Sequence, residues 1–495
     1  MWRRRQSGEF GNHHETNSST TETRWLAVDR GTFLDRAGSR VRSRCCSKVG
    51  SRDHVQHVEL LSGVFSGAGD VRSGAVRGLP FQPPKHVTMS DSASGPAEST
   101  GRRQVVVTGI GLVTPFGDER ETSWSAICQG RSAVQWFEQN DHGNSGPLGR
   151  RWVGASAPAR FLASAEPVVS MAVFAAREAL SHAALSRLSE QAGCVIGTSK
   201  LGLRSFSKAM KTSDSSDPAL PWPNAAARAV ASEWNLRGPA LCPVAACATG
   251  LVSLVRGADL IRSGECDVVL AGSSDASLVP IVLGSFQRLG VMAREFESPA
   301  TACRPFDAER SGFVIGEGAA VLVLEDREHA VTRGANILAQ FIAGGMASDP
   351  CGMTQVDPAG TSLAWLIRDV LRRAHVAPDE IDAINLHGTA TRANDIAESR
   401  AVHAVFGSAA DRLACSSQKG AIGHLLGAAG SVESAIAVLS MRDQIVPPTI
   451  NLRTPDPQCD LDYVPNESRP MRLRTVLKLS LGFGGHVAVG LFRAP

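Results

Sequence analysis

The sequence predicts an α/β fold in which strands and helices alternate from about residue 101 to the C-terminus. Short β-branched apolar runs end in small polar residues, and between them lie longer stretches whose apolar residues recur at helical spacing. Strands that alternate with helices are typical of a mostly parallel central sheet covered by helices. The rhythm resumes after residue 335, which favours an internal duplication.

The individual elements follow from these two periodicities. In the first part, strands are predicted at 105–108, 193–200, 266–277 and 319–326, with helices at 167–185 and after residue 247. In the second part, strands are predicted at 335–347 and 381–391 and a closing strand near 475–492, with helices at 362–376, 395–407 and 431–443. The segment 412–424 lies between the last two of these helices.

The first hundred residues differ in charge from the remainder. They carry fourteen Lys and Arg against ten Asp and Glu, a net of +4, so the whole-chain charge of +3 leaves −1 for residues 101–495. The main body is therefore not expected to bind nucleic acid. We interpret residues 1–100 as a disordered or non-native N-terminal extension, with Met89 as an alternative start. We expect the protein in the cytoplasm, or in an organelle if residues 1–88 are a transit peptide.

Composition excludes several classes of protein. Hydrophobic residues make up 43% and charged residues 20%, an ordinary globular balance. No apolar run reaches the ~18 residues that a membrane span needs. The eleven cysteines are scattered, without a CxxC pair or a Cys/His metal spacing. This pattern indicates a reducing compartment and argues against a disulfide framework or a zinc site.

A cysteine stands where an apolar segment meets a helix, in CPVAACATG (242–250). Cys247 would face the free N–H groups and the positive end of the helix dipole there, an arrangement that predicts a depressed pKa and a nucleophilic thiol. Gly250 lets the backbone crowd the turn. The alternative is that Cys247 is a small buried residue, as most free cysteines are.

Two histidines and a glycine-rich loop accompany this cysteine. His387 lies just past a predicted strand in INLHGTAT, and His424 lies in SQKGAIGHLLGAAG, five residues after Lys419. Groups at the carboxyl ends of strands converge on one crevice in α/β proteins, so one Cys and two His in such places favour a common site. The loop LGFGGHV (481–487) can present a backbone N–H to an oxyanion.

From about residue 103 to the C-terminus the chain resembles the β-ketoacyl-acyl-carrier-protein synthases, closest to the elongating type II enzymes. The resemblance is carried, in order, by VVVTGIGLVTPFG, AACATG, CRPFDAERSGFVIGEGAAVLVLE, LHGTATRANDIAES, KGAIGHLLGAAGSVES, VPPTINL, CDLDYVP and GFGG. It implies a thiolase-like fold with two duplicated αβαβα halves, placed here at residues 101–355, with the nucleophile, and 356–495, with the histidine pair. It also implies a homodimer.

The resemblance implies a reaction and the residues that perform it. The family joins malonyl-ACP to a cysteine-bound acyl group by decarboxylative Claisen condensation and elongates a fatty-acid chain. Matched by motif, Cys247 is the acylated nucleophile, and His387 and His424 are the decarboxylation pair. Lys419 resembles the lysine that orders the histidines, and Glu433 a supporting acid.

The remaining carried-over roles concern the substrate. Thr389 and Thr391 match threonines that hold the phosphopantetheine arm of the acyl carrier protein. The N–H groups of Cys247 and Phe483 would form the oxyanion hole, and the Phe483 side chain resembles the gate to the acyl pocket. Substrates arrive on the carrier, so no metal or redox cofactor is implied.

Three alternatives stay open. A polyketide or polyene ketosynthase differs only in substrate, and Ala245 and the loop LSLGFGGHV depart from the usual family pattern in ways that bear on acyl selectivity. A thiolase would carry a second cysteine in the GFGG loop, which has none. A non-catalytic partner like the chain-length factors would lack the active cysteine, so it is the remote alternative.

Overall fold

The computed structural model describes residues 103–137, 152–212, 222–294 and 296–495. The predicted N-terminal extension, 1–100, and the alternative start at Met89 lie outside the described residues. Among the described residues, no helix combines the length and apolar character needed to cross a membrane.

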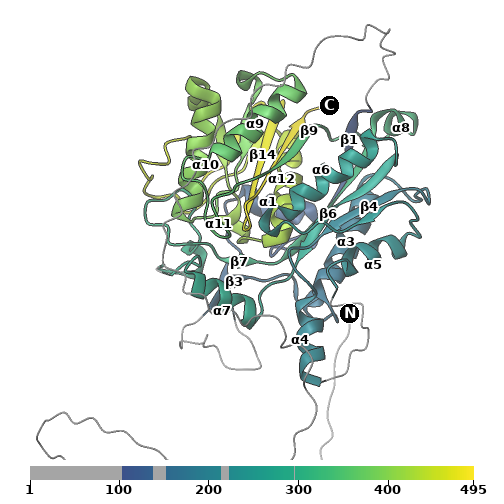
Figure 1. The fold of residues 1–495 in the computed structure, drawn as a ribbon, viewed down its shortest axis with the longest axis horizontal. Helices are drawn as coiled ribbons and strands as arrows, with labels where there is room; N and C mark the ends of the chain where they lie inside the picture. The colour runs from purple at the N-terminus through teal and green to yellow at the C-terminus, as the bar shows by residue number, and fades with distance from the viewer. Residues whose placement is uncertain (1–102, 138–151, 213–221, 295) are drawn as a thin grey trace, which may run out of the picture. The chain divides into compact units, whose positions relative to one another are not determined.

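Ten strands form one sheet in the order β11-β10-β14-β15-β9-β1-β8-β6-β4-β5 (Figure 1). The first five in sequence are β1 (Val105–Val113), β4 (Gly193–Gly197), β5 (Ala240–Leu241), β6 (Val268–Asp275) and β8 (Gly318–Asp326). The second five are β9 (Ala339–Ser348), β10 (Ala383–Asn385), β11 (Ala414–Ser416), β14 (Thr475–Gly482) and β15 (His486–Arg493).

The strand order confirms the duplication. Numbered by sequence within each set of five, both sets are arranged third, second, fourth, fifth, first from the outer edge inward. The two first strands, β1 and β9, pair in the middle. In this arrangement β9 holds the place in the second half that β1 holds in the first.

The expectation of mostly parallel central strands is wrong. Within this ten-stranded sheet, parallel pairing is confined to the outer strands, where β4 pairs with β5 and β6, and β10 with β11 and β14. The middle of the sheet, from β6 to β14, is antiparallel. The predicted closing strand is a hairpin of β14 and β15, because residues 483–485 turn the chain back.

Helices complete five layers. α3 (Pro167–His182) and α5 (Ala225–Glu233) pack on the first half, and α9 (Thr361–Ala374) and α10 (Arg392–Phe406) belong to the second. α6 (Thr249–Arg262) and α12 (Ala429–Asp443) form the middle layer, and every residue of α12 up to Met441 is buried. Both halves thus contribute one helix to a shared centre.

The two middle helices cross at their N-terminal ends. A Cβ at Gly250 would lie 2.2 Å from the amide nitrogen of Ser431, and one at Gly430 would lie 2.4 Å from that of Leu251. Only glycines permit this approach. The crossing brings the start of α6, which follows Cys247, next to the start of α12, which follows His424.

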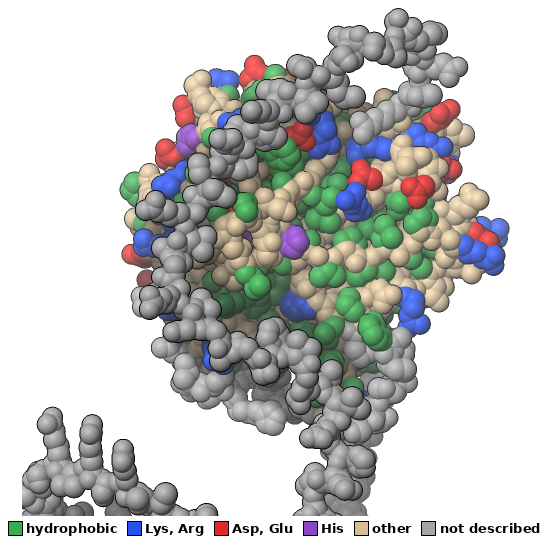
Figure 2. All heavy atoms as spheres, in the orientation of Figure 1, with side chains coloured by type: hydrophobic (Ala, Val, Ile, Leu, Met, Phe, Trp, Pro, Cys, Tyr) green, Lys and Arg blue, Asp and Glu red, His purple; other side chains and the backbone are tan. Residues whose placement is uncertain are grey.

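The shorter elements lie around this framework. They are α1 (Arg120–Cys128), α2 (Ala159–Leu162), α4 (Leu203–Thr212), α7 (Pro280–Leu289), α8 (Arg327–Thr332), α11 (Lys419–Ile422), β2 (Gln135–Phe137), β3 (Trp152–Ala155), β7 (Ile315–Gly316), β12 (Ile445–Val446) and β13 (Arg469–Pro470). On the face drawn in Figure 2, basic and acidic side chains are mixed toward the rim, and hydrophobic and uncharged atoms fill much of the middle.

Candidate active site

Cys247 lies in a single 3₁₀ turn, Ala246–Ala248, between β5 and α6. The preceding Ala246 has φ of 45°, in the left-handed region that residues with a Cβ rarely adopt. Such strain persists only where the surroundings enforce it. The position predicted for Cys247, directly before a helix, is confirmed, and the side chain is buried.

The end of β14 lies directly against this turn. A Cβ at Gly482 would be 2.7 Å from the carbonyl oxygen of Ala245 and 3.1 Å from the amide nitrogen of Cys247. The next residue, Phe483, directs its backbone N–H at the Cys247 sulfur. The backbones of Cys247 and Phe483, whose N–H groups are predicted to form the oxyanion hole, therefore lie close together.

The depressed pKa predicted for Cys247 is wrong. Burial raises the pKa of this thiol to about 11, although Lys200, Lys419 and the Phe483 N–H act to lower it. The sulfur packs in a cluster with Leu278 and other apolar side chains, which disfavours a thiolate. At neutral pH Cys247 is therefore a thiol that must lose its proton while it reacts.

His387 lies two residues past the end of β10, on a segment held by hydrogen bonds. Its backbone N–H and that of Gly388 donate to the two carboxyl oxygens of Glu398, each at 2.6 Å. Nζ of Lys419 donates to the His387 carbonyl at 2.5 Å and lies 3.5 Å from Nδ1. An ammonium only donates, so Nδ1 is the acceptor and Nε2 carries the ring proton.

His424 follows α11 and faces His387. The two imidazole centroids are 5.2 Å apart with an interplanar angle of 82°, and the ring of Phe313 lies 5.2 Å from His424 on an edge. The His424 backbone N–H donates to the carbonyl of Val314 at 2.7 Å. Nδ1 of His424 is buried and has no hydrogen-bond partner in the described part of the chain.

Both histidines are held neutral. Burial is the main cause that lowers the pKa of each well below 6.5, and the charge of Lys419 lowers both further. An uncharged imidazole carries one N–H, so each ring can donate one hydrogen bond. It is a much weaker acid than the protonated imidazolium.

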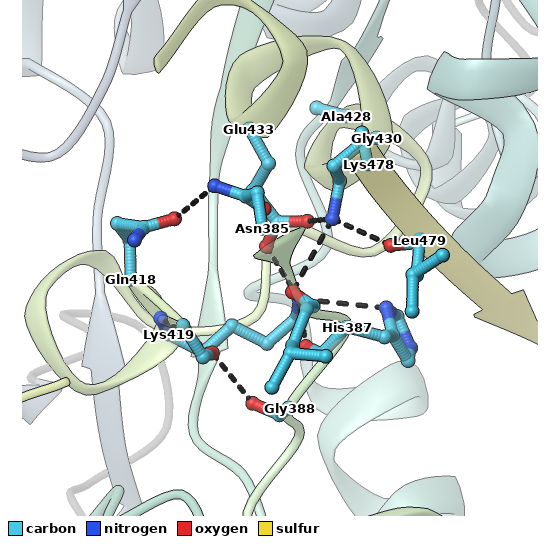
Figure 3. Close-up of polar contacts among 12 residues, drawn as sticks. Asn385, His387, Gly388, Gln418, Lys419, Ala428, Gly430, Glu433, Lys478 and Leu479 are labelled. Atoms are coloured by element: carbon cyan, nitrogen blue, oxygen red, sulfur yellow. Dashed lines mark hydrogen bonds and ion pairs between the residues drawn. The ribbon is translucent and has the colours of Figure 1, made fainter. Parts of the chain in front are cut away.

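Lys419 and Glu433 stand behind the histidines. Lys419 has no exposed surface, and its ammonium forms a close ion pair with Oε1 of Glu433 on α12. Figure 3 shows Lys419 extending between His387 and Glu433. Neither residue lines the cavity described below. Lys419 and Glu433 therefore lie where they can position the two histidines.

Most of the residues predicted for the site line one cavity of about 110 Å³. It is lined by Cys247, His387, His424, Thr389, Thr391 and Phe483, among others. The hydroxyl oxygens of the two threonines are 2.9 Å apart. The Phe483 ring lies 6.1 Å from that of Phe286, which packs against the apolar cluster around Cys247. The sequence-predicted nucleophile, histidines, threonines and gate therefore meet in one place.

The sequence did not predict two charged residues that lie near the site. Glu398 holds the backbone of His387, and Lys478 of β14 forms an ion pair with Oε2 of Glu433 at 2.7 Å. A signal for Lys478 was available, since it is a charged residue inside the otherwise apolar run TVLKLSLG. Glu398 offered none, because an acidic residue on a helix is ordinarily solvated.

The residues described do not assemble a metal centre. No group of three or more His, Cys, Asp and Glu side chains within residues 103–137, 152–212, 222–294 and 296–495 is placed to hold a metal ion.

The duplicated five-layer architecture and a buried cysteine beside two neutral histidines define a ketosynthase of the thiolase-like fold. Residues 102–330 match the family described as Beta-ketoacyl synthase, N-terminal domain, and residues 338–453 match Beta-ketoacyl synthase, C-terminal domain. The chain belongs to the beta-ketoacyl synthase family.

Individual relatives agree with this assignment. The chain is 37% identical over 400 residues to a 3-oxoacyl-[acyl-carrier-protein] synthase 2 of Coxiella burnetii, covering 78% of this chain and 97% of that one. It is 33% identical to a chloroplastic 3-oxoacyl-[acyl-carrier-protein] synthase I of Hordeum vulgare, over 84% and 94% of the two chains.

A solved structure has the same fold. A type II PKS ketosynthase, bound to a hexaketide and in complex with its acyl-carrier protein, superimposes with a TM-score of 0.73 at 34% identity, covering 80% of this chain and 100% of that one.

Proposed function

We propose that the protein is a 3-oxoacyl-acyl-carrier-protein synthase, which condenses malonyl-ACP with an acyl group on Cys247 and so elongates a fatty-acid chain. The convergence of Cys247, His387 and His424 on one small cavity carries the proposal. The chain spans nearly the full length of relatives named for this activity.

The first step loads the enzyme. The Cys247 sulfur attacks the thioester carbonyl of the acyl-carrier, a C–S bond forms, and the carrier thiol leaves. Since burial holds the pKa of Cys247 at about 11, its proton departs as the bond forms and ends on the leaving pantetheine sulfur. The N–H groups of Cys247 and Phe483 stabilise the tetrahedral oxyanion.

The second step releases CO₂ from malonyl-ACP. The bond between the carboxylate and the methylene carbon breaks, and its electron pair becomes an enolate on the malonyl thioester. His387 donates from Nε2 to the enolate oxygen, because Lys419 occupies the other side of its ring. His424 supplies the second donor. Removal of one such donor typically costs about 3 kcal/mol of barrier.

The third step forms the new carbon–carbon bond. The enolate carbon attacks the acyl-Cys247 carbonyl, the oxyanion again meets the two backbone N–H groups, and the C–S bond breaks. The 3-oxoacyl chain leaves on the carrier, and the Cys247 sulfur is released as a thiolate that takes a proton from water. Thr389 and Thr391, on the wall of the cavity, hold the pantetheine arm.

The substrate class needs its own test, because the ketosynthase in the solved structure carries a hexaketide. The protein is incubated with a panel of saturated acyl-carriers and with polyketide or polyene acyl-carriers, and the mass of the Cys247 peptide is measured. Saturated chains on Cys247 support fatty-acid elongation. Exclusive loading of polyketide or polyene chains would replace it by the second candidate.

A homodimer completes the proposal. β5 is an edge strand within the described residues, and both of its residues are exposed. Leu241 is 40% exposed and Val244 52% exposed, three residues before the nucleophile. An unpaired edge with apolar side chains is a template for pairing with another chain. A second copy is the partner that we propose.

The carrier and the location follow from the same assignment. The acyl carrier protein is the proposed partner in catalysis, as it is in the solved ketosynthase complex. The proposed location is the cytoplasm, or an organelle if residues 1–88 act as a transit peptide, since the barley relative is chloroplastic. Fusing residues 1–88 to a fluorescent protein distinguishes the two locations.

A further inference from the structure

Glu433 is shared by two buried lysines from different elements. Lys419 of α11 pairs with Oε1, and Nζ of Lys478 on β14 lies 2.7 Å from Oε2. All three side chains are at most 2% exposed. These two are the lysines with fully buried side chains in the described part of the chain. Figure 3 shows Lys478 and Lys419 approaching the carboxylate from separate segments.

Two ammonium groups against one carboxylate leave an excess positive charge in the core. Burying such a charge is costly unless hydrogen bonds satisfy it. Lys478 donates to the carbonyls of Leu479 at 2.6 Å and Leu386 at 3.3 Å. Glu433 alone is enough to pair with Lys419. The presence of Lys478 against the same carboxylate therefore needs a separate explanation.

The two lysines bond consecutive carbonyls of the catalytic segment. Lys478 donates to Leu386 and Lys419 donates to His387, and Glu433 joins the two ammonium groups. The backbone that carries the His387 ring is thus tied to β14 on one side and to α11 on the other.

We propose that Lys478 is a positioning residue for decarboxylation, which with Glu433 and Lys419 forms a Lys–Glu–Lys bridge that fixes the backbone at His387 and keeps both imidazoles uncharged. The inference rests on the proposed function. Neutral rings matter because an imidazolium would bind the malonyl carboxylate in its ground state and would protonate the enolate before it could attack acyl-Cys247.

The charged groups around Lys478 are consistent with this role. The pKa of Lys478 is lowered to about 8, chiefly by burial and also by the charge of Lys419, although Glu433 and Glu398 act to raise it. The charge of Lys478 contributes to the lowered pKa of His387 after burial, Lys419 and His424, and to that of His424 after burial, Lys419 and Lys200. The ammonium is therefore charged at neutral pH and loses its charge above about pH 8.

The test is the pH profile of CO₂ release from malonyl-carrier by Lys478→Met, which removes the charge and keeps the aliphatic stem. The acid limb of kcat should move to higher pH by about half a unit to one unit, because both histidines become easier to protonate. Above pH 8 the effect of the charge should vanish, since the wild-type lysine is then also neutral, and a lower kcat that remains in the variant reports the lost hydrogen bonds to the Leu386 and Leu479 carbonyls. KM for malonyl-carrier should change by less than about twofold.

A matched control is Ser480→Ala, two residues further along β14 and equally buried. It should leave the acid limb in place. An unshifted limb in Lys478→Met, or the same shift in Ser480→Ala, overturns the inference. If wild-type protein releases no CO₂ from malonyl-carrier, the proposed function fails instead, so the two failures are distinguishable.

A second variant covers the case in which Lys478→Met does not fold. Glu433→Gln leaves two unpaired buried ammonium groups, and adding Lys478→Met removes one of them. The double variant should have a higher Tm than Glu433→Gln alone, because one unpaired buried charge is gone. A double variant that is less stable than Glu433→Gln contradicts the bridge.

Discussion

The reactivity of Cys247 toward iodoacetamide tests the largest disagreement between sequence and structure. Its position before a helix predicts a thiolate near neutral pH, whereas burial raises its pKa to about 11. With that value, the thiolate fraction is roughly 10⁻⁴ at pH 7 and roughly 10⁻² at pH 9. Since the thiolate is the species that reacts, alkylation should accelerate about tenfold per pH unit over this range.

The assay is brief labelling at pH 7, 8, 9 and 10, followed by mass spectrometry of the cysteine peptides. Cys351 is an internal reference, because it is exposed in the loop after β9 while its pKa is raised by a hydrogen bond with Asp349. We expect Cys351 to label faster than Cys247 at pH 7. Prior loading with acyl-carrier should protect Cys247 and leave Cys351 reactive.

The reasoning is refuted if Cys247 labelling reaches a plateau below pH 8. Such a plateau would mean that the N–H groups, Lys200 and Lys419 stabilise the thiolate more than apolar burial disfavours it. It would restore the prediction made from the helix start. The variant Cys247→Ala identifies the peptide signal without ambiguity.

The remaining predictions use separate assays. Cys247→Ala should abolish condensation but still release CO₂ from malonyl-carrier, whereas His387→Ala should lose CO₂ release and keep part of its acyl uptake; the reverse pattern contradicts the division of roles. Gly482→Ala should slow condensation by about 100-fold, because a Cβ would push the Cys247 turn away from the Phe483 N–H, and unchanged kcat would show that the turn adapts. Val244→Asp should turn a dimer into a monomer in analytical ultracentrifugation, and a dimer that survives this charge places the interface elsewhere. The free energy of unfolding should fall as the pH drops below 6.5, because His387 and His424 bind protons in the unfolded chain but stay unprotonated in the folded site. His424→Asn should therefore reduce the slope of Tm against pH. An unchanged slope would mean that His424 is protonated in the folded protein.

The sequence alone determined the alternation of strands and helices, because the spacing of apolar residues shows which face of each element is buried. The predicted helix at 167–185 is α3 (Pro167–His182), and that at 362–376 is α9 (Thr361–Ala374). The same logic placed His387 after a strand and Cys247 before a helix. Residue type and position favoured a common site, and the family resemblance supplied the role of each residue in it.

The tertiary structure decided what depends on neighbours distant in sequence. Strand direction was one case, since the antiparallel centre follows from pairing of β1 with β8 and β9, which no local pattern records. The pKa of Cys247 was another, because the desolvation of a thiol is the sum of all the atoms that enclose it. Lys478 was a third: its charge stands out in the apolar run TVLKLSLG, but only the packing of β14 against Glu433 of α12 makes it part of the site.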